Sequence, residues 1–133
     1  MANRPLLIEN LGKAWTGDLE TLLGQYTEDC IFEDKAFGLV HHDHSGLREV
    51  FNFTYKMMPD FRVAYGDCAI GESFGAVQWV FTGSFHGDFE GYLHSGTPVR
   101  IEGVSFMKLR DGRIAHNADY WNLAALALQL RKD

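Results

Sequence analysis

Residues 99–122 read VRIEGVSFMKLRDGRIAHNADYWN and contain two strand-like runs joined by Asp111-Gly112. Both residues of an Asp-Gly pair tolerate the positive φ of a type I′ turn, so this pair predicts a β-hairpin. Because side chains alternate along a strand, the odd-numbered residues from Ile101 to Met107 should share one face of the first strand.

Asp119 is the unusual residue of the second strand. It shares a face with Ala115, Asn117 and Trp121, in a segment rich in aromatic residues and away from any turn. A carboxylate in this setting lies either at a sheet edge in water or in a pocket where it takes part in chemistry.

Length and composition narrow the class of protein. The 133 residues are 46% apolar and 14% aromatic, which predicts one domain, residues 1–133, with enough aromatic surface to fill a core, line a cavity or cover a subunit interface. The net charge of −6 disfavours nucleic acid as a partner.

The cellular location is predicted from what the sequence lacks. No apolar run approaches the ~20 residues that span a bilayer, and the N-terminal segment has no apolar signal-peptide core. We therefore expect no membrane partner and a cytoplasmic protein with reduced Cys30 and Cys68, although a single buried disulfide stays an alternative.

Helical spacing of apolar residues dominates the sequence before residue 60. Asn3 and Pro5 predict the start of a first helix that ends near residue 17. Asp18 should cap a second helix over residues 19–26, and a third should run from Ser45 to Pro59. Between them we expect a short strand at residues 30–34 and a loop at residues 35–45.

From Phe61 onward the period changes from helical to two. Strands are predicted at residues 61–70 and 76–85, with a long hairpin connection at residues 87–98 before the hairpin of residues 99–120. Gly83 marks a bulge or a close backbone approach, and Asn122 should cap a helix over residues 123–130. This order predicts an α+β fold: a cone-shaped, curved, mostly antiparallel sheet wrapped by N-terminal helices, with a short C-terminal helix.

The order of elements resembles the nuclear-transport-factor-two-like (NTF2-like) superfamily, whose fold is a cystatin-like α+β barrel, and the details are similar to SnoaL-like polyketide cyclases. The motifs that carry the resemblance are Trp15-Thr-Gly-Asp18, Tyr26-Thr-Glu-Asp29, Pro59-Asp60-Phe61, Thr82-Gly83, Ser95-Gly96-Thr97-Pro98-Val99, Asp111-Gly112-Arg113-Ile114 and Asp119-Tyr120-Trp121. The resemblance implies a homodimer that acts on a hydrophobic small molecule without a cofactor.

The resemblance also implies a role for Asp119, which occupies the place of the family's general acid/base on the last strand. The family often carries Gly-Thr-His on the long middle strand. Here the match runs Gly83-Ser84-Phe85, so that Phe85 takes the histidine position and His86 comes one residue late.

Two neighbouring enzyme classes offer alternatives. Ketosteroid isomerases, in which the surroundings set the pKa values of the active-site carboxyl groups, carry their base on the first strand. Asp34 matches the position of that base. The positions of their oxyanion-hole Tyr and protonated Asp hold Asn10 and Ser105 here. Limonene-epoxide-hydrolase-like proteins use an Asp–Arg–Asp set, of which Asp119 matches one member and residues 77–83 supply neither of the others.

Physical chemistry gives Asp119 a functional and a structural interpretation. Burial would raise its pKa, by as much as ~3–5 units if complete, and general acid/base catalysis is worth ~10²–10⁴ in rate. It could then remove a proton α to a carbonyl and drive an aldol-type ring closure. Alternatively, Asp119 accepts a structural hydrogen bond from a Trp N–H or a backbone amide, and Asp34 simply begins a loop.

Aromatic and polar residues at strand and helix spacing are candidates for the pocket wall, although each could equally be plain core. The substrate-pocket candidates are Trp15, Tyr55, Met58, Trp79, Phe81, Phe85, His86 and Ser105. The cluster His41-His42-Asp43-His44 suggests a metal site, but adjacent loop positions rarely provide coordination geometry. We therefore predict no metal and no other cofactor.

These patterns and the family resemblance together predict a small-molecule enzyme, a cyclase or isomerase that works by general acid/base chemistry at Asp119. The alternatives are a ketosteroid-isomerase-like proton shuttle at Asp34 and a non-catalytic module that binds a ligand or dimerises. A closed cavity with a carboxylate at its floor would favour the enzymes.

Overall fold

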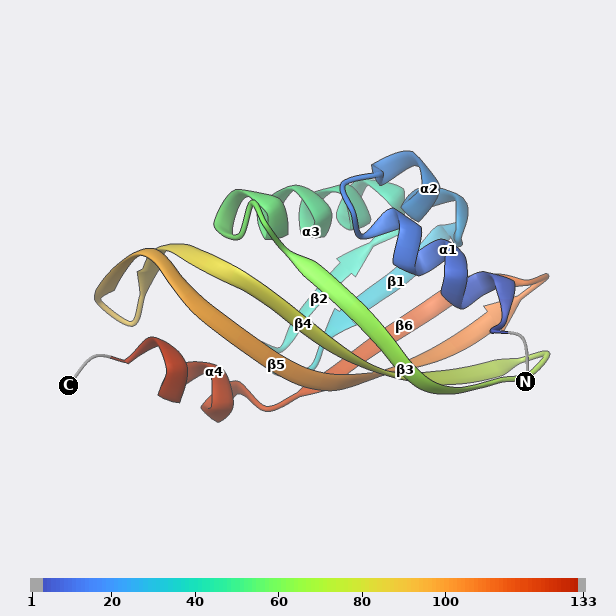
Figure 1. Ribbon diagram of the computed structural model, residues 1–133. Coiled ribbons are helices and arrows are strands. Elements are labelled where there is room, and N and C mark those ends of the chain that lie inside the picture. The colour runs from blue at the N-terminus through green and yellow to red at the C-terminus, as the bar shows by residue number, and fades with distance from the viewer. Residues whose placement is uncertain (1–3, 132–133) are drawn as a thin grey trace.

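The computed structural model describes residues 4–131 (Figure 1). Within these residues, four helices and six strands follow one another. In order they are α1 (Leu6–Ala14), α2 (Leu19–Gly24), β1 (Tyr26–Asp34), β2 (Leu39–His42), α3 (Asp43–Met57), β3 (Arg62–Ile70), β4 (Phe74–Phe89), β5 (Tyr92–Arg110), β6 (Arg113–Trp121) and α4 (Leu123–Leu130).

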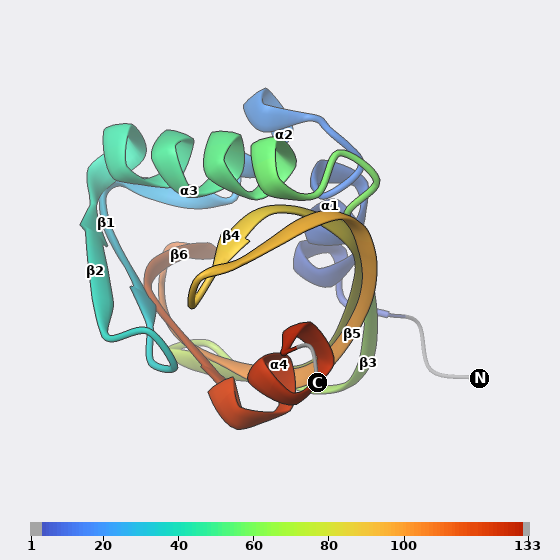
Figure 2. The same cartoon turned by 90° about the vertical axis from the view of Figure 1, so that its left-hand side faces the viewer.

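All six strands belong to one sheet with the order β2-β1-β6-β5-β4-β3. Neighbouring strands are antiparallel except β1 and β6, which are parallel. Figure 2 shows the sheet curving strongly, with α1 and α3 lying over one side of it. The predicted α+β fold with a curved, mostly antiparallel sheet is confirmed.

The predicted hairpin between β5 and β6 is present. Asp111 and Gly112 have φ values of 53° and 78°, as a type I′ turn requires. The faces of β5 also follow the predicted alternation, because Ile101 and Met107 are buried while Phe106 is 42% exposed.

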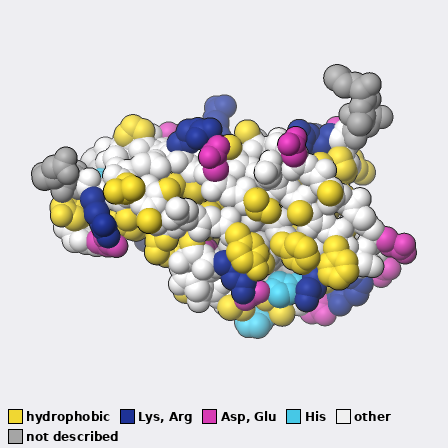
Figure 3. Space-filling view, turned by 90° about the horizontal axis from the view of Figure 1, so that it is seen from below, with side chains coloured by type: hydrophobic (Ala, Val, Ile, Leu, Met, Phe, Trp, Pro, Cys, Tyr) yellow, Lys and Arg dark blue, Asp and Glu magenta, His cyan; other side chains and the backbone are white. Residues whose placement is uncertain are grey.

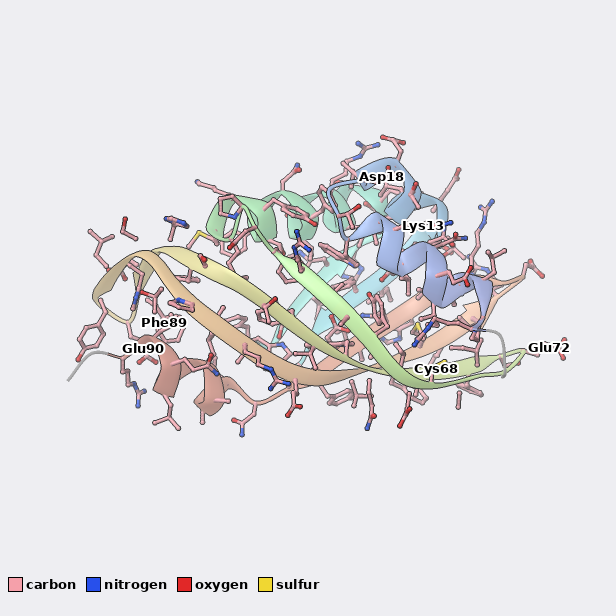
Figure 4. The ribbon with its side chains drawn as sticks, in the orientation of Figure 1. Lys13, Asp18, Cys68, Glu72, Phe89 and Glu90 are labelled. Atoms are coloured by element: carbon pink, nitrogen blue, oxygen red, sulfur yellow. The ribbon has the colours of Figure 1, made fainter. Side chains whose placement is uncertain are left out.

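The predicted hairpin at residues 87–98 is present, but its long connection is paired strand, because β4 and β5 continue to a tight turn. Glu90 and Gly91 make its turn with φ values of 51° and 86°, and Phe89 pairs directly with Tyr92. A register shift after Phe85 absorbs the irregularity that the sequence suggested was a loop. Figure 4 shows Phe89 and Glu90 at the end of this hairpin, beside α4.

The helix caps follow the sequence more closely than the helix ends do. The side chains of Asp18 and Asn122 accept backbone N–H groups at 3.1 Å and 2.9 Å, and so cap α2 and α4. The predicted cap Asn3 lies outside the described residues. Helix α2 ends at Gly24 rather than at residue 26, so Tyr26 begins strand β1 instead.

The predicted loop at residues 35–45 was also partly wrong. Residues 39–42 form β2, which pairs antiparallel with β1 through Glu33 and Val40, and α3 begins at Asp43. The reason is that pairing with β1 satisfies backbone groups that a loop would leave to water.

The helices and the inner face of the sheet enclose the core. Leu126 and Leu130 of α4 are buried, and Gln129 hydrogen-bonds both backbone groups of Arg100, which attaches α4 to β5. No helix within residues 4–131 is long and apolar enough to cross a membrane. The most deeply buried side chains are Ile8, Leu22, Cys30, Leu47, Val77, Ile101, Met107, Ile114 and Leu130.

Candidate active site

Three polar side chains lie in one row across the inner face of the sheet. In the strand register Asp119 of β6 is the partner of Ser105 on β5 and of Asp34 on β1. Register partners on adjacent strands project to the same face about 5 Å apart. The fold therefore places two carboxylates and a hydroxyl together at the floor of the cone.

Hydrogen bonds hold one oxygen of Asp119. Ser105 Oγ donates to Asp119 Oδ1 at 2.5 Å, and Asn117 Nδ2 donates to the same oxygen at 2.8 Å. Trp79 Nε1 donates to Ser105 Oγ at 2.9 Å, so the serine accepts from the indole and donates to the carboxylate. Asp119 Oδ2 accepts no hydrogen bond from the described residues and is open to a ligand.

Burial and neighbours adjust the acidity of Asp119. Desolvation raises the pKa of Asp119 from 3.8 to about 6, although the hydrogen bonds from Ser105 and Asn117 oppose the rise. The negative charge of Asp34 adds a smaller upward contribution. A carboxyl group with this pKa exchanges a proton readily near neutral pH.

Asp34 begins a turn, as one interpretation of the sequence predicted, and its side chain also lines the cavity. Its Oδ1 accepts the backbone N–H groups of Ala36 and Phe37, each at 3.0 Å, so the residue does begin a turn. The same oxygen accepts Trp121 Nε1 at 3.1 Å. The side chain also lines the cavity, and Oδ2 has no hydrogen-bond partner among residues 4–131.

A cavity of about 710 Å³ opens above this row of polar groups, a volume typical of small-molecule sites. Its wall is mainly apolar and aromatic. Of the predicted site residues it contains Trp15, Asp34, Met58, Trp79, Phe81, Phe85, Ser105 and Asp119; its other aromatic members are Tyr26, Phe32, Phe37, Phe53, Phe61, Tyr65, Phe89 and Trp121.

Two predicted pocket residues do not line this cavity. The ring of Tyr55 packs at 4.8 Å from Phe51 and 5.9 Å from Phe61, in the aromatic cluster beneath α3. His86 is exposed, because side chains alternate along β4 and Phe85, in phase with Trp79 and Phe81, takes the inner face. This alternation already indicated that His86 points away from the cavity, whereas the sequence does not reveal the packing of Tyr55.

Three polar residues near Asp119 were missed by sequence reasoning. Asn117 lies two residues earlier on the same face of β6, a spacing that could have identified it. Tyr65 alternates with Val63 on β3, so its inward direction was predictable but its neighbourhood was not. Tyr26 was assigned to a helix, which concealed its place on the cavity wall.

The charged residues that line the cavity are acidic. Asp34, Glu49, Asp88 and Asp119 contribute carboxyl groups, while no Lys or Arg belongs to the lining residues of the described chain. His41 is the one histidine among these lining residues. The site consequently favours neutral or cationic ligands over anions.

The histidine cluster does not assemble a metal site. His44 Nε2 contacts the backbone oxygen of Tyr26 at 3.2 Å, His42 is exposed, and Asp43 accepts the N–H of Ser45 at 2.9 Å. Nowhere in residues 4–131 do three or more His, Cys, Asp or Glu side chains lie where they could hold a metal ion.

A curved mixed sheet covered by helices, with a buried carboxylate in an apolar cavity, defines the NTF2-like class of α+β proteins, which includes ketosteroid-isomerase-like folds. The model of the SnoaL-like polyketide cyclase family matches residues 8–130. The chain therefore belongs to the SnoaL-like polyketide cyclase family.

Solved structures of similar fold accompany this match. A protein of ketosteroid-isomerase-like fold from Catenulispora acidiphila, solved with trimethylamine, superposes with a TM-score of 0.81 at 19% identity over 96% of this chain and 94% of that one. IdmH of Streptomyces antibioticus, a candidate polyketide cyclase, superposes with a TM-score of 0.79 at 25% identity, over 93% of this chain and 95% of that one. A candidate polyketide cyclase from Xanthomonas campestris gives 0.79 at 20% identity over 94% of both chains.

Among curated proteins, no significant sequence match was found. Family membership and the fold together support an enzyme of the cyclase or isomerase type.

Proposed function

We propose that the protein is a cofactor-independent cyclase or isomerase that uses Asp119 as general acid/base on a hydrophobic carbonyl compound. The observation that carries the proposal is the arrangement of Asp119 itself. Its Oδ1 is fixed by two donors, its Oδ2 is open to a large apolar cavity, and its pKa is raised to about 6.

The reaction begins when ionised Asp119 removes a proton from the carbon next to a carbonyl group. The electron pair of that C–H bond forms an enolate. In a cyclase the enolate carbon attacks a second carbonyl of the same molecule, a C–C bond forms, and Asp119 returns its proton to the new alkoxide. In an isomerase the proton returns to a different carbon.

The cavity contributes by folding and desolvating the substrate. Aromatic walls hold a flexible chain with its two reacting carbons close together, which lowers the entropy barrier to ring closure. The acidic lining without Lys or Arg supports a substrate that is neutral, such as an ester or ketone, rather than a free acid.

Asp34 supplies a second candidate base for the same chemistry. It lies in the same row as Asp119 and its Oδ2 is open to the same cavity. However, three donors hold its other oxygen, and two of them are the backbone groups of a turn. We therefore assign the proton transfer to Asp119. The role assigned to Asp34 is electrostatic, because its negative charge helps to raise the pKa of Asp119.

A dimer is also proposed, through the outer face of the sheet. Phe74, Phe106 and Tyr120 are 56%, 42% and 51% exposed there, and Figure 3 shows hydrophobic side chains gathered on this face. Charges of both signs border the patch, namely the ion pair of Arg100 with Glu102 and the side chains of Lys108, His116 and Glu33. Such a self-complementary border suits a second copy of the same chain related by a two-fold axis.

Deuterium exchange tests the proposed base without knowledge of the natural substrate. α-Tetralone, a neutral bicyclic aryl ketone, exchanges its α-protons in D₂O when a base removes them. The unmodified protein should accelerate this exchange, while Asp119→Asn should reduce the acceleration by at least 10²-fold, a typical contribution of a general base, with unchanged ketone affinity.

Matched controls separate the candidate functions. Asp67→Asn removes an exposed carboxylate of β3 and should change nothing. If Asp34→Asn abolished exchange and Asp119→Asn did not, the base would be Asp34. Binding of α-tetralone without any acceleration would support a non-catalytic binding module and refute the enzyme.

A further inference from the structure

Two tyrosines from well-separated strands line the same cavity as Asp119; Tyr26 is buried and Tyr65 is half-buried. Tyr26 lies on β1 and Tyr65 on β3, strands that stand far apart in the order β2-β1-β6-β5-β4-β3. The curvature of the sheet brings them together, because both side chains line the same cavity and each phenol senses the charge of Asp119.

The hydroxyl groups of these tyrosines are unused by the protein. Neither hydroxyl has a hydrogen-bond partner within the described chain, although the ring of Tyr26 is only 3% exposed. Neither belongs to the polar atoms that are sealed away without a partner, so both are accessible from the cavity. A buried phenol without a partner loses free energy unless a ligand supplies an acceptor.

Both phenols remain donors throughout the physiological range. Burial raises the pKa of Tyr26 well above 10, and the charges of Asp119 and Tyr65 add to the effect. Burial and Asp119 likewise raise the pKa of Tyr65. Each O–H therefore stays protonated and ready to donate to an oxygen that acquires negative charge.

The pairing of β3 with β4 links Tyr65 to the residues that hold Asp119. Tyr65 pairs with Trp79 across β3 and β4, and Trp79 donates to the serine that holds Asp119. Tyr26 lies on the same cavity wall as Phe32, with the two ring centroids 6.4 Å apart. A carbonyl compound placed over Asp119 Oδ2 would therefore occupy the cavity that both phenols line.

We propose that Tyr26 and Tyr65 form the oxyanion site of the reaction and donate hydrogen bonds to the carbonyl oxygen of the substrate while Asp119 removes the α-proton. This inference rests on the proposed function. As the C–H electron pair moves into the enolate, the oxygen gains negative charge and both O–H groups hold it without giving up their protons. The donors replace those that Asn10 and Ser105 do not provide at the positions used by ketosteroid isomerases.

A naphthol probe tests this assignment directly. In the Asp119→Asn variant the amide mimics the protonated acid, and bound 2-naphtholate mimics the enolate. The ultraviolet absorbance of bound 2-naphthol measures its ionised fraction as a function of pH. Adding Tyr26→Phe or Tyr65→Phe to this background should lower the ratio of bound naphtholate to bound naphthol about tenfold each, because each removes one charge-assisted hydrogen bond.

Controls distinguish the proposed oxyanion site from the proposed general acid/base role of Asp119 on which it rests. Tyr92→Phe removes an exposed phenol at the tip of the β4–β5 hairpin and should leave the ratio unchanged. In the presence of Asp119, each cavity Phe variant should slow α-tetralone exchange without weakening ketone binding more than a few-fold. Naphthol that binds but ionises equally in all variants would overturn the oxyanion site alone. Failure of 2-naphthol to bind at all would overturn the proposed pocket and this inference together.

Discussion

Asp119→Asn should make the protein more stable at neutral pH, although it should abolish catalysis. In the folded protein the pKa of Asp119 is about 6, compared with an ordinary value of 3.8. The folded state therefore binds the proton more tightly than the unfolded state does. The contribution of Asp119 to the free energy of unfolding is fully present below pH 3.8. It is lost as pH rises to about 6, because above that pH the folded protein must hold a charged, poorly solvated carboxylate.

The magnitude of the effect follows from the two pKa values. Each pKa unit is worth about 1.4 kcal/mol, so ionisation of Asp119 costs about 3 kcal/mol above pH 6. Solvation by water in the cavity reduces this to about 2–3 kcal/mol. Asparagine is neutral at every pH and keeps an oxygen that can accept from Ser105. The variant should therefore gain this amount at pH 8 and almost nothing at pH 4.

Urea unfolding of the two proteins between pH 4 and pH 8 provides the measurement. The difference between their unfolding free energies isolates Asp119, because other carboxyl groups whose pKa values are lowered, such as Asp18 and Asp60, contribute equally to both. A difference that stays constant with pH, or a variant that is less stable at pH 8, would refute the claim that ionised Asp119 lowers the free energy of unfolding.

Three further predictions concern the surroundings of this carboxylate and the outer face. Ser105→Ala removes a donor from Asp119, so the midpoint of the exchange-rate profile should move from about pH 6 to about pH 7 or higher, because a hydrogen bond to a charged group is worth about 1.5–3 kcal/mol. Gly103→Ala would press a Cβ into the ring of Trp79 and place it 2.8 Å from the backbone oxygen of Tyr120; the resulting shifts of side chain and backbone should lower stability by about 1–3 kcal/mol in urea unfolding. Phe106→Asp should convert a dimer to monomers in sedimentation experiments.

Each of these predictions has its own control. Ser95→Ala removes an exposed hydroxyl and should leave the pH midpoint in place, while an unmoved midpoint in Ser105→Ala would exclude its hydrogen bond as a determinant of acidity. Normal stability of Gly103→Ala would show that Trp79 has room to move. Leu6→Asp alters a residue of α1 that is 68% exposed, on the helix that lies over the other side of the sheet, so it should sediment as the unmodified protein does.

Turns and caps were predictable because their chemistry acts within a few residues. The Asp111-Gly112 pair forms the expected turn and Asp18 caps its helix, since both depend on local dihedral angles and adjacent backbone donors. The equally tight turn at Glu90 was missed because glutamate seldom adopts positive φ. There the pairing of two long strands determines the backbone conformation, and the preference of the single residue does not.

The candidate site was only partly within reach of the sequence. Alternation along β6 placed Asp119 on the inner face with Asn117, and the family resemblance marked it as a candidate base, a role that stays a prediction. His86 lies outside the cavity lining because alternation along β4 puts it on the face opposite to Trp79 and Phe85, which the sequence pattern already indicated. Tyr26 and Tyr65 were hidden as neighbours, since they belong to strands at separate positions in the sheet.

The sequence by itself determined the class of fold, the two faces of each strand and the presence of one carboxylate among aromatic residues. These depend on periodicity and turn chemistry, which are properties of short segments. The tertiary structure decided that Asp119 is desolvated, that Ser105 and Asn117 hold one of its oxygens, and that two phenols line the same cavity. Acidity and hydrogen bonding depend on what surrounds a group in space, and only the curvature of the whole sheet assembles those surroundings.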